Sequence, residues 1–163
     1  MKLRKITVML TFALLICLTG CKKTIPYNAR IINDDYEFNE EFIINNKTFG
    51  ADSKDGHYID DDTFPKERMI IINDETSFKN AFKTFEEIDF TKEMIVMHAF
   101  TTASNSEYEL KNIKYNEKKL TIEYITKKTN GINPPNASKP DTKWLIVKLD
   151  SLDIDEVNFV FCA

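Results

Sequence analysis

Glycine and histidine are scarce in this chain, and their scarcity excludes several kinds of site. The 163 residues include four glycines and two histidines. Phosphate-binding loops use several glycines to bring the backbone close to the ligand, and a three-histidine zinc site needs more histidines than the chain has. The G-x-S-x-G, H-E-x-x-H, C-x-x-C and Walker patterns are absent as well. We therefore predict that the protein is not an enzyme and holds no metal or other cofactor.

A second absence is a hydrophobic run long enough to cross a membrane. The apolar stretch over residues 7–18 has about a dozen residues, whereas a membrane-spanning helix needs about 20. Three basic residues, Lys2, Arg4 and Lys5, precede this stretch. A basic start followed by a short apolar stretch is typical of a secretory signal.

The signal-like segment ends in a motif that predicts lipid attachment. The run Leu18-Thr19-Gly20-Cys21 resembles the bacterial lipobox, which is cleaved immediately before a cysteine whose thiol carries a diacylglyceryl group. The resemblance implies a signal peptide over 1–20, lipid on Cys21, and a chain anchored at the extracytoplasmic face of a bacterial cell membrane. Two or more acyl chains hold stably, since each buried CH₂ contributes about 0.8 kcal/mol. Ordinary signal cleavage beside an incidental cysteine and a buried amphipathic helix are the alternatives.

The formal net charge of −4 is unevenly distributed along the chain. Without residues 1–20 the chain has 19 basic and 26 acidic residues, a net charge of −7, and the whole excess lies in residues 22–100. An acidic surface repels anionic lipid headgroups and nucleic acid. We therefore expect no nucleic-acid partner and assign membrane attachment to the lipid.

Cysteine is scarce too, which bears on disulfides and on nucleophilic chemistry. Once Cys17 leaves with the signal and Cys21 carries lipid, only Cys162 remains in the folded part, so no intramolecular disulfide is expected. Cys162 ends the apolar run 157–162, where a free cysteine typically packs as a small buried residue. A nucleophile and base formed by Cys162 and His98 is the alternative, and we favour a core histidine beside a buried thiol.

The rest of the chain fits one domain behind a short tether. Residues 21–30 are polar apart from a few side chains and include a proline, which is typical of a tether, and 31–163 has the length of a single domain. One amphipathic helix is predicted over about 74–85. Asp74 is a suitable N-cap, and the aromatic residues that follow recur at helical spacing.

Apolar alternation predicts most of the strands. The run MIVMHAF over 94–100 is apolar on both faces except at His98, which predicts a central strand covered on both sides. Other segments with the pattern of strands are 68–73, 108–115, 120–124, 143–149 and 157–162. The order of elements predicts an α+β fold, with a mostly antiparallel sheet of about five or six strands and one main helix.

The acidic segment 52–62 raises the question of calcium. With Gly56 at the sixth position of an EF-hand loop, Ala51 falls where a liganding aspartate is required, and Asp62 replaces the bidentate glutamate. The EF-hand register therefore fails. A calcium clamp of another kind, built from the aspartates of this segment, stays open beside a solvated acidic loop.

Two polar loops are candidate partner-binding elements. Loop 129–141 is long, and its prolines lower the entropy cost of binding an extended partner. Loop 101–107 leaves the predicted central strand. The candidate residues are Thr101, Thr102, Asn105, Tyr108, Asn133, Pro134 and Pro135. Plain connections between strands are the alternative.

Apolar patterns over residues 75–160 are similar to those of a known domain. They comprise the aromatic helix, the run IDFTKEMIV over 88–96, the strand that begins at Tyr108, and WLIVKL over 144–149. On these residues the segment resembles the PrcB-like domain of exported bacterial lipoproteins, named for a subunit that accompanies and stabilises a surface protease. The family's Thr-Gly-Gly-Tyr turn corresponds to residues 103–108, which keep the tyrosine without the glycines.

The resemblance implies an accessory role without catalysis. We therefore predict a lipid-anchored envelope or surface lipoprotein that acts as a protein-binding module, with an exported protease as the implied partner. The alternative is an envelope lipoprotein that binds a small ligand or calcium through residues 52–62.

Overall fold

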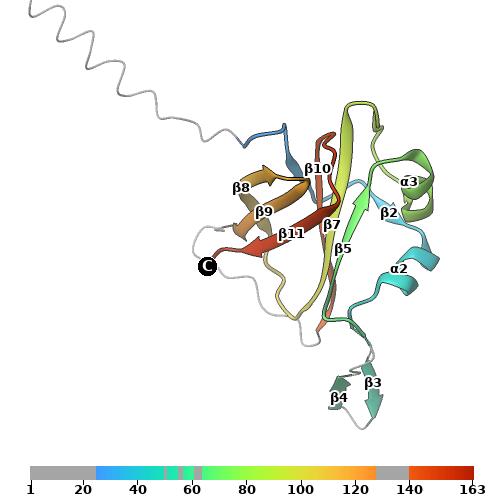
Figure 1. Cartoon of the computed structure of the whole chain (residues 1–163). Helices are drawn as coiled ribbons and strands as arrows, with labels where there is room; N and C mark the ends of the chain where they lie inside the picture. Colours follow the sequence, from blue (N-terminus) through green and yellow to red (C-terminus); the bar gives the residue numbers. More distant parts are fainter. Residues whose placement is uncertain (1–24, 50, 55–56, 61–63, 128–139) are drawn as a thin grey trace, which may run out of the picture.

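A four-stranded antiparallel sheet lies at the centre of the computed structural model, which describes residues 25–49, 51–54, 57–60, 64–127 and 140–163 (Figure 1). The strand order is β1-β10-β7-β5. Their bounds are Arg30–Ile32 for β1, Asp141–Asp150 for β10, Glu93–Thr102 for β7 and Glu67–Ile72 for β5. Each of the two faces of this sheet carries its own hydrophobic core.

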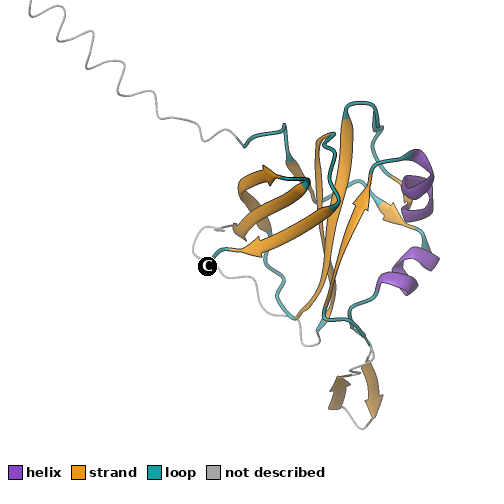
Figure 2. Cartoon of the chain, viewed as in Figure 1, coloured by secondary structure: helices purple, strands orange, loops and turns teal. Residues whose placement is uncertain are grey.

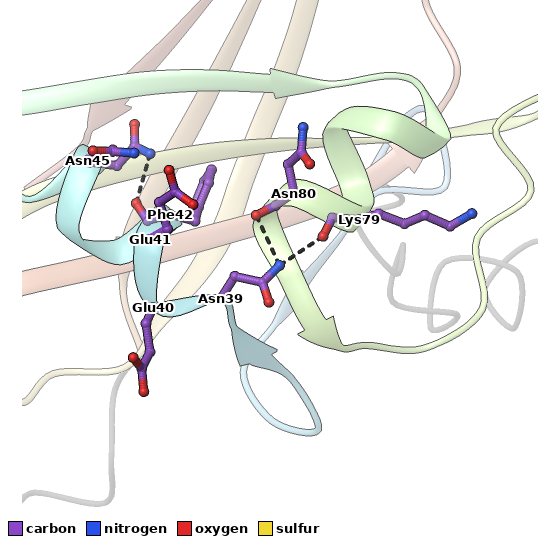
Figure 3. A pocket seen from close by; sticks show the side chains of 8 residues that line it. Asn39, Glu40, Glu41, Phe42, Asn45, Lys79 and Asn80 are labelled. Carbon is purple, nitrogen blue, oxygen red and sulfur yellow. Dashed lines mark hydrogen bonds between the residues drawn. The ribbon is translucent and has the colours of Figure 1, made fainter.

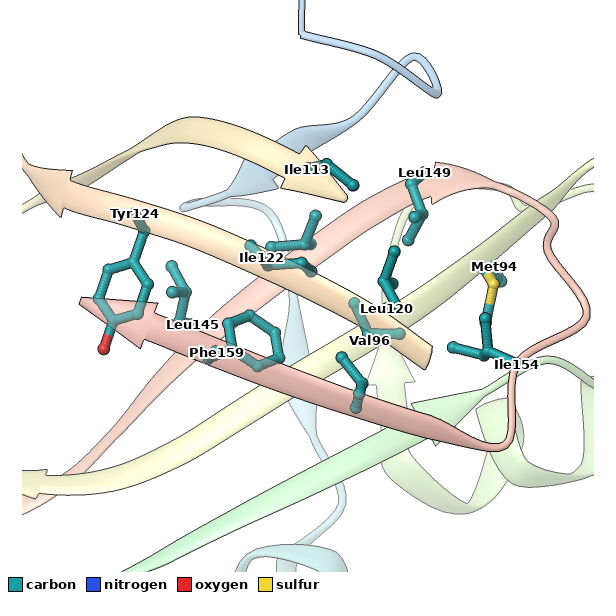
Figure 4. Packing of buried hydrophobic residues seen from close by; sticks show 12 residues of the cluster. Met94, Val96, Ile113, Leu120, Ile122, Tyr124, Leu145, Leu149, Ile154 and Phe159 are labelled. Carbon is teal, nitrogen blue, oxygen red and sulfur yellow. The ribbon is translucent and has the colours of Figure 1, made fainter. Parts of the chain in front are cut away.

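A second, three-stranded sheet packs on one face of the central sheet (Figure 1). Its strands, in the order β11-β9-β8, are β11 (Glu156–Phe161), β9 (Lys119–Thr126) and β8 (Tyr108–Asn116). β8 and β9 form the predicted antiparallel hairpin, whereas β11 joins β9 in parallel. Large apolar side chains from both sheets point toward one another and fill the space between them (Figure 4).

Two short helices and a small sheet cover the opposite face of the central sheet (Figure 2). The helices are α2 (Glu40–Asn46) and α3 (Glu75–Ala81), and β2 (Glu37–Phe38) pairs with β6 (Phe82–Thr84). Aromatic rings dominate this core, because the Phe38 ring centroid lies 5.0 Å from that of Phe82 and 4.8 Å from that of Trp144. The described residues thus form three layers, with the central sheet in the middle.

Strand β7 belongs to both cores, as its sequence predicted. Met94 and Val96 face the three-stranded sheet, whereas Ile95 and Met97 face the helical side, and all four are fully buried. A strand between β10 and β5 with both faces covered favours apolar residues on both faces, and His98 is the buried polar exception. The prediction of a central strand over 94–100 is therefore confirmed.

The predicted helix over 74–85 is shorter in the structure. Asp74 caps it as expected, because its carboxylate accepts a hydrogen bond from the Ser77 amide at 2.8 Å. The helix ends at Ala81, and residues 82–84 pair with β2 as strand β6. Phe78, Phe82 and Phe85 recur at helical spacing and therefore predicted a longer helix. In the structure their rings reach the same core from a short helix followed by a short strand.

The number of elements also differs from the prediction. The described residues form eleven strands in four sheets, where the sequence predicted one sheet of five or six strands, and α2 is a second helix. Part of the predicted acidic loop is an antiparallel hairpin of β3 (Ala51–Lys54) and β4 (His57–Asp60). The coarser prediction, an α+β fold with mainly antiparallel pairing, is confirmed.

The described part of the predicted tether, from Ile25 onward, packs on the sheets. The Tyr27 ring meets the Tyr115 ring edge-on at 6.5 Å, and the Tyr27 carbonyl accepts a hydrogen bond from the Asp150 amide at 2.9 Å. Residues 1–20 and Cys21 lie outside the described residues. None of the helices in the described ranges has the length and apolar character needed to cross a membrane.

Candidate functional site

Thr101 and Thr102, two candidate binding residues at the end of β7, form hydrogen bonds inside the fold. Thr101 Oγ1 donates to the Thr48 carbonyl at 2.8 Å, and the Thr48 amide donates to Thr142 Oγ1 at 3.0 Å. These bonds attach the segment after α2 to β7 and β10. Thr102 Oγ1 accepts a hydrogen bond from the Ser104 amide at 3.0 Å. Both threonines therefore have structural roles.

Tyr108, another of the candidates, begins β8 and lies beside a groove. Its ring meets the Tyr124 ring edge-on at 5.4 Å and the Phe100 ring at 5.9 Å. Burial raises the pKa of the Tyr108 hydroxyl. Asn105 precedes it in the loop between β7 and β8. Among the candidates that the structure describes, Tyr108 is the one that lines a groove next to the central sheet.

This groove, which we call the β10 groove, has a volume of about 380 Å³. It lies where the start of β8 and the end of β9 approach the first half of β10, and the segment after β1 closes it from the other side. Its lining residues are Ile32, Asn33, Asp34, Tyr36, Ser106, Glu107, Tyr108, Lys127, Lys143, Trp144 and Leu145. The groove therefore runs along one edge of the central sheet.

That edge of β10 is only half covered by β1. β7 pairs with the whole of β10, whereas β1 pairs with Ile146–Lys148 alone. No strand within the described ranges pairs with 141–145 on this side. The chain leaves the sheet after Ile32 and turns through Asp35, whose φ is 65°. Among the residues that the structure describes, the first half of β10 is therefore an open sheet edge.

The direction of the backbone groups on this edge follows from ladder geometry. The Asp150 amide donates to the Tyr27 carbonyl on the β1 side, so every second residue back along β10 directs its N–H and C=O to that side. Trp144 and Thr142 are two of these residues. The Thr142 amide already donates to the Asp141 carboxylate at 2.7 Å. Trp144, which lines the β10 groove, therefore directs both backbone groups to the open side of β10, and Thr142 directs its carbonyl to the same side.

Lys143 gives the β10 groove a positive charge that lacks a carboxylate partner in the described part of the chain. Its Nζ donates to the Ser106 carbonyl at 2.7 Å and lies 5.4 Å from the centroid of the Tyr108 ring. Burial lowers the pKa of Lys143, and the nearby Glu107 carboxylate opposes this shift. Lys127, the other cation of the groove, forms an ion pair with Glu107 at 2.7 Å.

His98, the candidate base, is enclosed in the core between the two sheets. Its side chain is 5% exposed, and its ring stacks on the Phe159 ring with centroids 5.2 Å apart. Nε2 lies 2.9 Å from Glu67 Oε2. Burial lowers the pKa of His98, and the hydrogen bond to Glu67 partly offsets this effect. His98 is therefore a core residue, as the sequence analysis favoured.

Cys162 does not lie in the core as we expected. It follows β11, where Val157 and Phe159 are buried, while Val160 is 43% exposed. The thiol is partly exposed, because the alternation of the strand places residue 162 on the same side as Val160 and opposite Phe159. The prediction of a buried thiol beside His98 is therefore wrong.

A second hollow, of about 570 Å³, lies between α2 and α3 (Figure 3). Asn39 Nδ2 donates to the carbonyl oxygens of Lys79 and Asn80 at 2.8 and 3.0 Å, which joins the start of α2 to the end of α3. Amide and carboxylate groups make up most of the rest of its lining. Phe42 is the one aromatic residue in its lining, whereas Tyr36, Tyr108 and Trp144 line the β10 groove.

Several predicted site residues lie outside the part of the chain that the structure describes. These are Cys21, Asn133, Pro134 and Pro135, together with the side chains of the acidic segment 52–62. Lipid attachment, partner binding by the long loop and calcium binding by the acidic segment therefore stay predictions.

Sequence reasoning missed the residues that give the β10 groove its character. Lys143 and Trp144 were assigned only to a strand, and Tyr36 was not singled out. The one local signal is a lysine followed by a tryptophan at the start of an apolar strand. Their exposure depends on where β1 ends, which lies more than 100 residues earlier in the chain.

Comparison of the chain with protein-family models, curated proteins and solved structures gives no match. The likeness to PrcB-like domains accordingly stays a prediction. The geometry of the β10 groove is the observation on which a function can be based.

Proposed function

We propose that this protein is a lipid-anchored, non-catalytic lipoprotein that binds another protein on the extracytoplasmic face of a bacterial membrane. The lipobox at Cys21 supports the anchor. The resemblance to PrcB-like domains makes an exported protease the first partner to test. The single observation that carries the binding role is the β10 groove, where an open sheet edge meets aromatic side chains.

Two properties of the β10 groove favour a protein over a small molecule. Its lining includes Trp144 on one face of β10 and Lys143 on the other, so it follows the edge of a strand. Within the described part of the chain, residues 141–145 of β10 also have no strand partner on this side, and extended polypeptide is the ligand that satisfies the backbone groups of such an edge most fully. Small-molecule sites are instead concave cavities that enclose most of the ligand.

Site-specific photo-crosslinking in intact cells tests the binding role. A photoreactive residue replaces the exposed Asn33 at the β10 groove, and a matched variant carries it at the exposed Ser151, beyond the far end of β10. We expect a reproducible crosslink to one exported protein from position 33 and a much weaker one from position 151. Failure to recover any protein from positions spread over the whole surface would contradict the proposed function.

The anchor has an independent test. Cells grown with labelled palmitate should incorporate label into the protein, and Cys21→Ser should abolish the label and release the chain from the membrane fraction. Cys162→Ser is the matched control and should keep both. Label that survives Cys21→Ser would show that the lipobox reading is wrong.

A further inference from the structure

We propose that the β10 groove binds an extended segment of the partner as an added strand on β10, with an acidic side chain placed beside Lys143. This inference rests on the proposed function and specifies how the partner is recognised. It commits to a strand of another protein, whose side chains alternate between apolar and acidic. Backbone pairing, side-chain surface and charge each support it.

The first support is the backbone of β10. Trp144 directs its N–H and C=O to the side that β1 leaves open, and Thr142 directs its carbonyl there. The open stretch 141–145 is about 16 Å long at roughly 3.3 Å per residue, which matches a short added strand. An incoming strand would continue the line of β1 and complete the ladder that β1 starts. Main-chain hydrogen bonds of this kind supply affinity with little sequence demand.

The second support is the surface on either side of that edge. On the helical side, the Trp144 ring lies 4.8 Å from the Phe38 ring and 5.7 Å from the Phe42 ring, and Tyr36 lines the groove beside it. On the other side are Lys143 and Tyr108. Side chains of an added strand alternate between these two faces. Every second residue would therefore meet aromatic surface, and the residues between would meet the lysine.

The third support is charge complementarity. Within the described residues, Lys127 is paired with Glu107, whereas Lys143 forms no ion pair of its own: it donates to a carbonyl and lies beside an aromatic ring, and the Glu107 carboxylate nearby is already paired with Lys127. A cation that burial has partly stripped of water gains more from a carboxylate than a fully solvated one does. The partner segment should therefore carry aspartate or glutamate at the position facing Lys143. A neutral or basic residue there leaves this charge without an ionic partner.

The test uses the full chain in detergent micelles and a displayed library of random heptapeptides. We expect enriched peptides to alternate apolar residues with at least one aspartate or glutamate. Lys143→Gln should weaken their binding about tenfold or more, and Lys143→Glu should weaken it further. Lys127→Gln is the matched control, because it removes a cation of the same groove that is already paired, and it should change binding less than about twofold. Equal binding to all four proteins would overturn the inference.

Backbone pairing has its own readout in amide hydrogen exchange. A bound peptide should slow exchange of the Trp144 amide, which lies on the open edge, and leave that of Leu145, which faces β7, unchanged. Peptides that bind without slowing Trp144 exchange would show that side chains alone recognise them, and the added strand would be wrong.

Other occupants give different results. If the free chain sediments as a dimer that the peptides dissociate, the groove binds a second copy of this chain and the proposed partner segment is wrong. A cellular partner that crosslinks from other positions but not from Asn33 would overturn this inference while leaving the proposed function intact. Absence of any cellular partner would instead overturn the proposed function.

Discussion

Both halves of β10 pair with β7 on one side, but only the second half pairs with β1 on the other side. In the second half, Ile146 and Val147 are fully buried, because β7 and β1 flank the strand and both cores cover its faces. In the first half, Lys143 and Trp144 stay partly exposed, because β1 has ended. One strand thus serves as core at one end and as an open edge at the other. The point at which β1 ends determines where the covered half of β10 gives way to the open edge.

The largest expected effect comes from the covered half. Ile146→Ala removes a fully buried side chain from the aromatic core and should lower the free energy of unfolding by about 2–5 kcal/mol. Lys143→Ala in the open half should cost less than about 1 kcal/mol. Denaturant unfolding of both variants measures the contrast. Similar losses at the two positions would mean that the halves do not differ as their burial indicates.

The next effect concerns the hydrogen bonds among Thr48, Thr101 and Thr142, at the open end of β10. Thr101→Val keeps the shape of the side chain and removes the hydrogen bond to the buried Thr48, so we expect a loss of about 1–3 kcal/mol of stability. Thr84→Val, at an exposed position of β6, is the control and should be nearly neutral. Peptide binding should survive Thr101→Val. A specific loss of binding at full stability would restore the partner-binding role that the sequence predicted for Thr101.

A smaller effect should appear as a pH dependence at His98, which pairs with Leu145 in the open half. Its pKa is lowered in the folded state, so the unfolded chain binds the proton more readily than the folded one. This destabilising effect is absent above the pKa of the unfolded chain, near 6.5. As the pH drops below that value, the free energy of unfolding falls.

Unfolding of the wild type and of His98→Phe between about pH 5 and pH 8 measures this dependence. The phenylalanine keeps a ring among Phe159 and Phe100 and removes the titration. We expect a flatter profile for the variant. Glu67→Gln should steepen it, because the carboxylate opposes the lowering of the pKa. An unchanged slope in His98→Phe would assign the dependence to other groups.

The smallest stability effect is expected at Lys143 itself. Lys143→Gln keeps a donor for the Ser106 carbonyl and should change the free energy of unfolding by less than about 0.5 kcal/mol. Its effect on peptide binding should nevertheless exceed those of Lys127→Gln and Thr101→Val, and Lys143→Glu should weaken binding more still. Thermal unfolding and peptide titration on one sample separate the two. A large stability loss would make Lys143 a structural residue.

Local sequence patterns correctly predicted the elements that depend on residues close to one another in the chain. Asp74 caps α3 through a residue three positions away, and β7 is apolar on both faces because both are covered. The same reasoning erred at residues 82–84, where pairing with β2 replaces the last turn of the predicted helix. It gave no sign of the hydrogen bonds that Thr101 forms inside the fold, since the partner hydroxyl and carbonyl belong to Thr48, 53 residues earlier.

The sequence by itself determined which segments become the six longest strands, β5 and β7 to β11, that β7 is central, that α3 follows the cap at Asp74, and that lipid attachment is expected at Cys21. These features depend on side-chain alternation and on contacts a few residues apart. Only the tertiary structure decided that these six strands divide between the four-stranded and the three-stranded sheet, that β11 runs parallel to β9, and that β1 stops halfway along β10. Strand pairing joins residues far apart in the chain, so its outcome depends on the packing of the whole domain. The open edge beside Lys143 and Trp144 is a product of that packing.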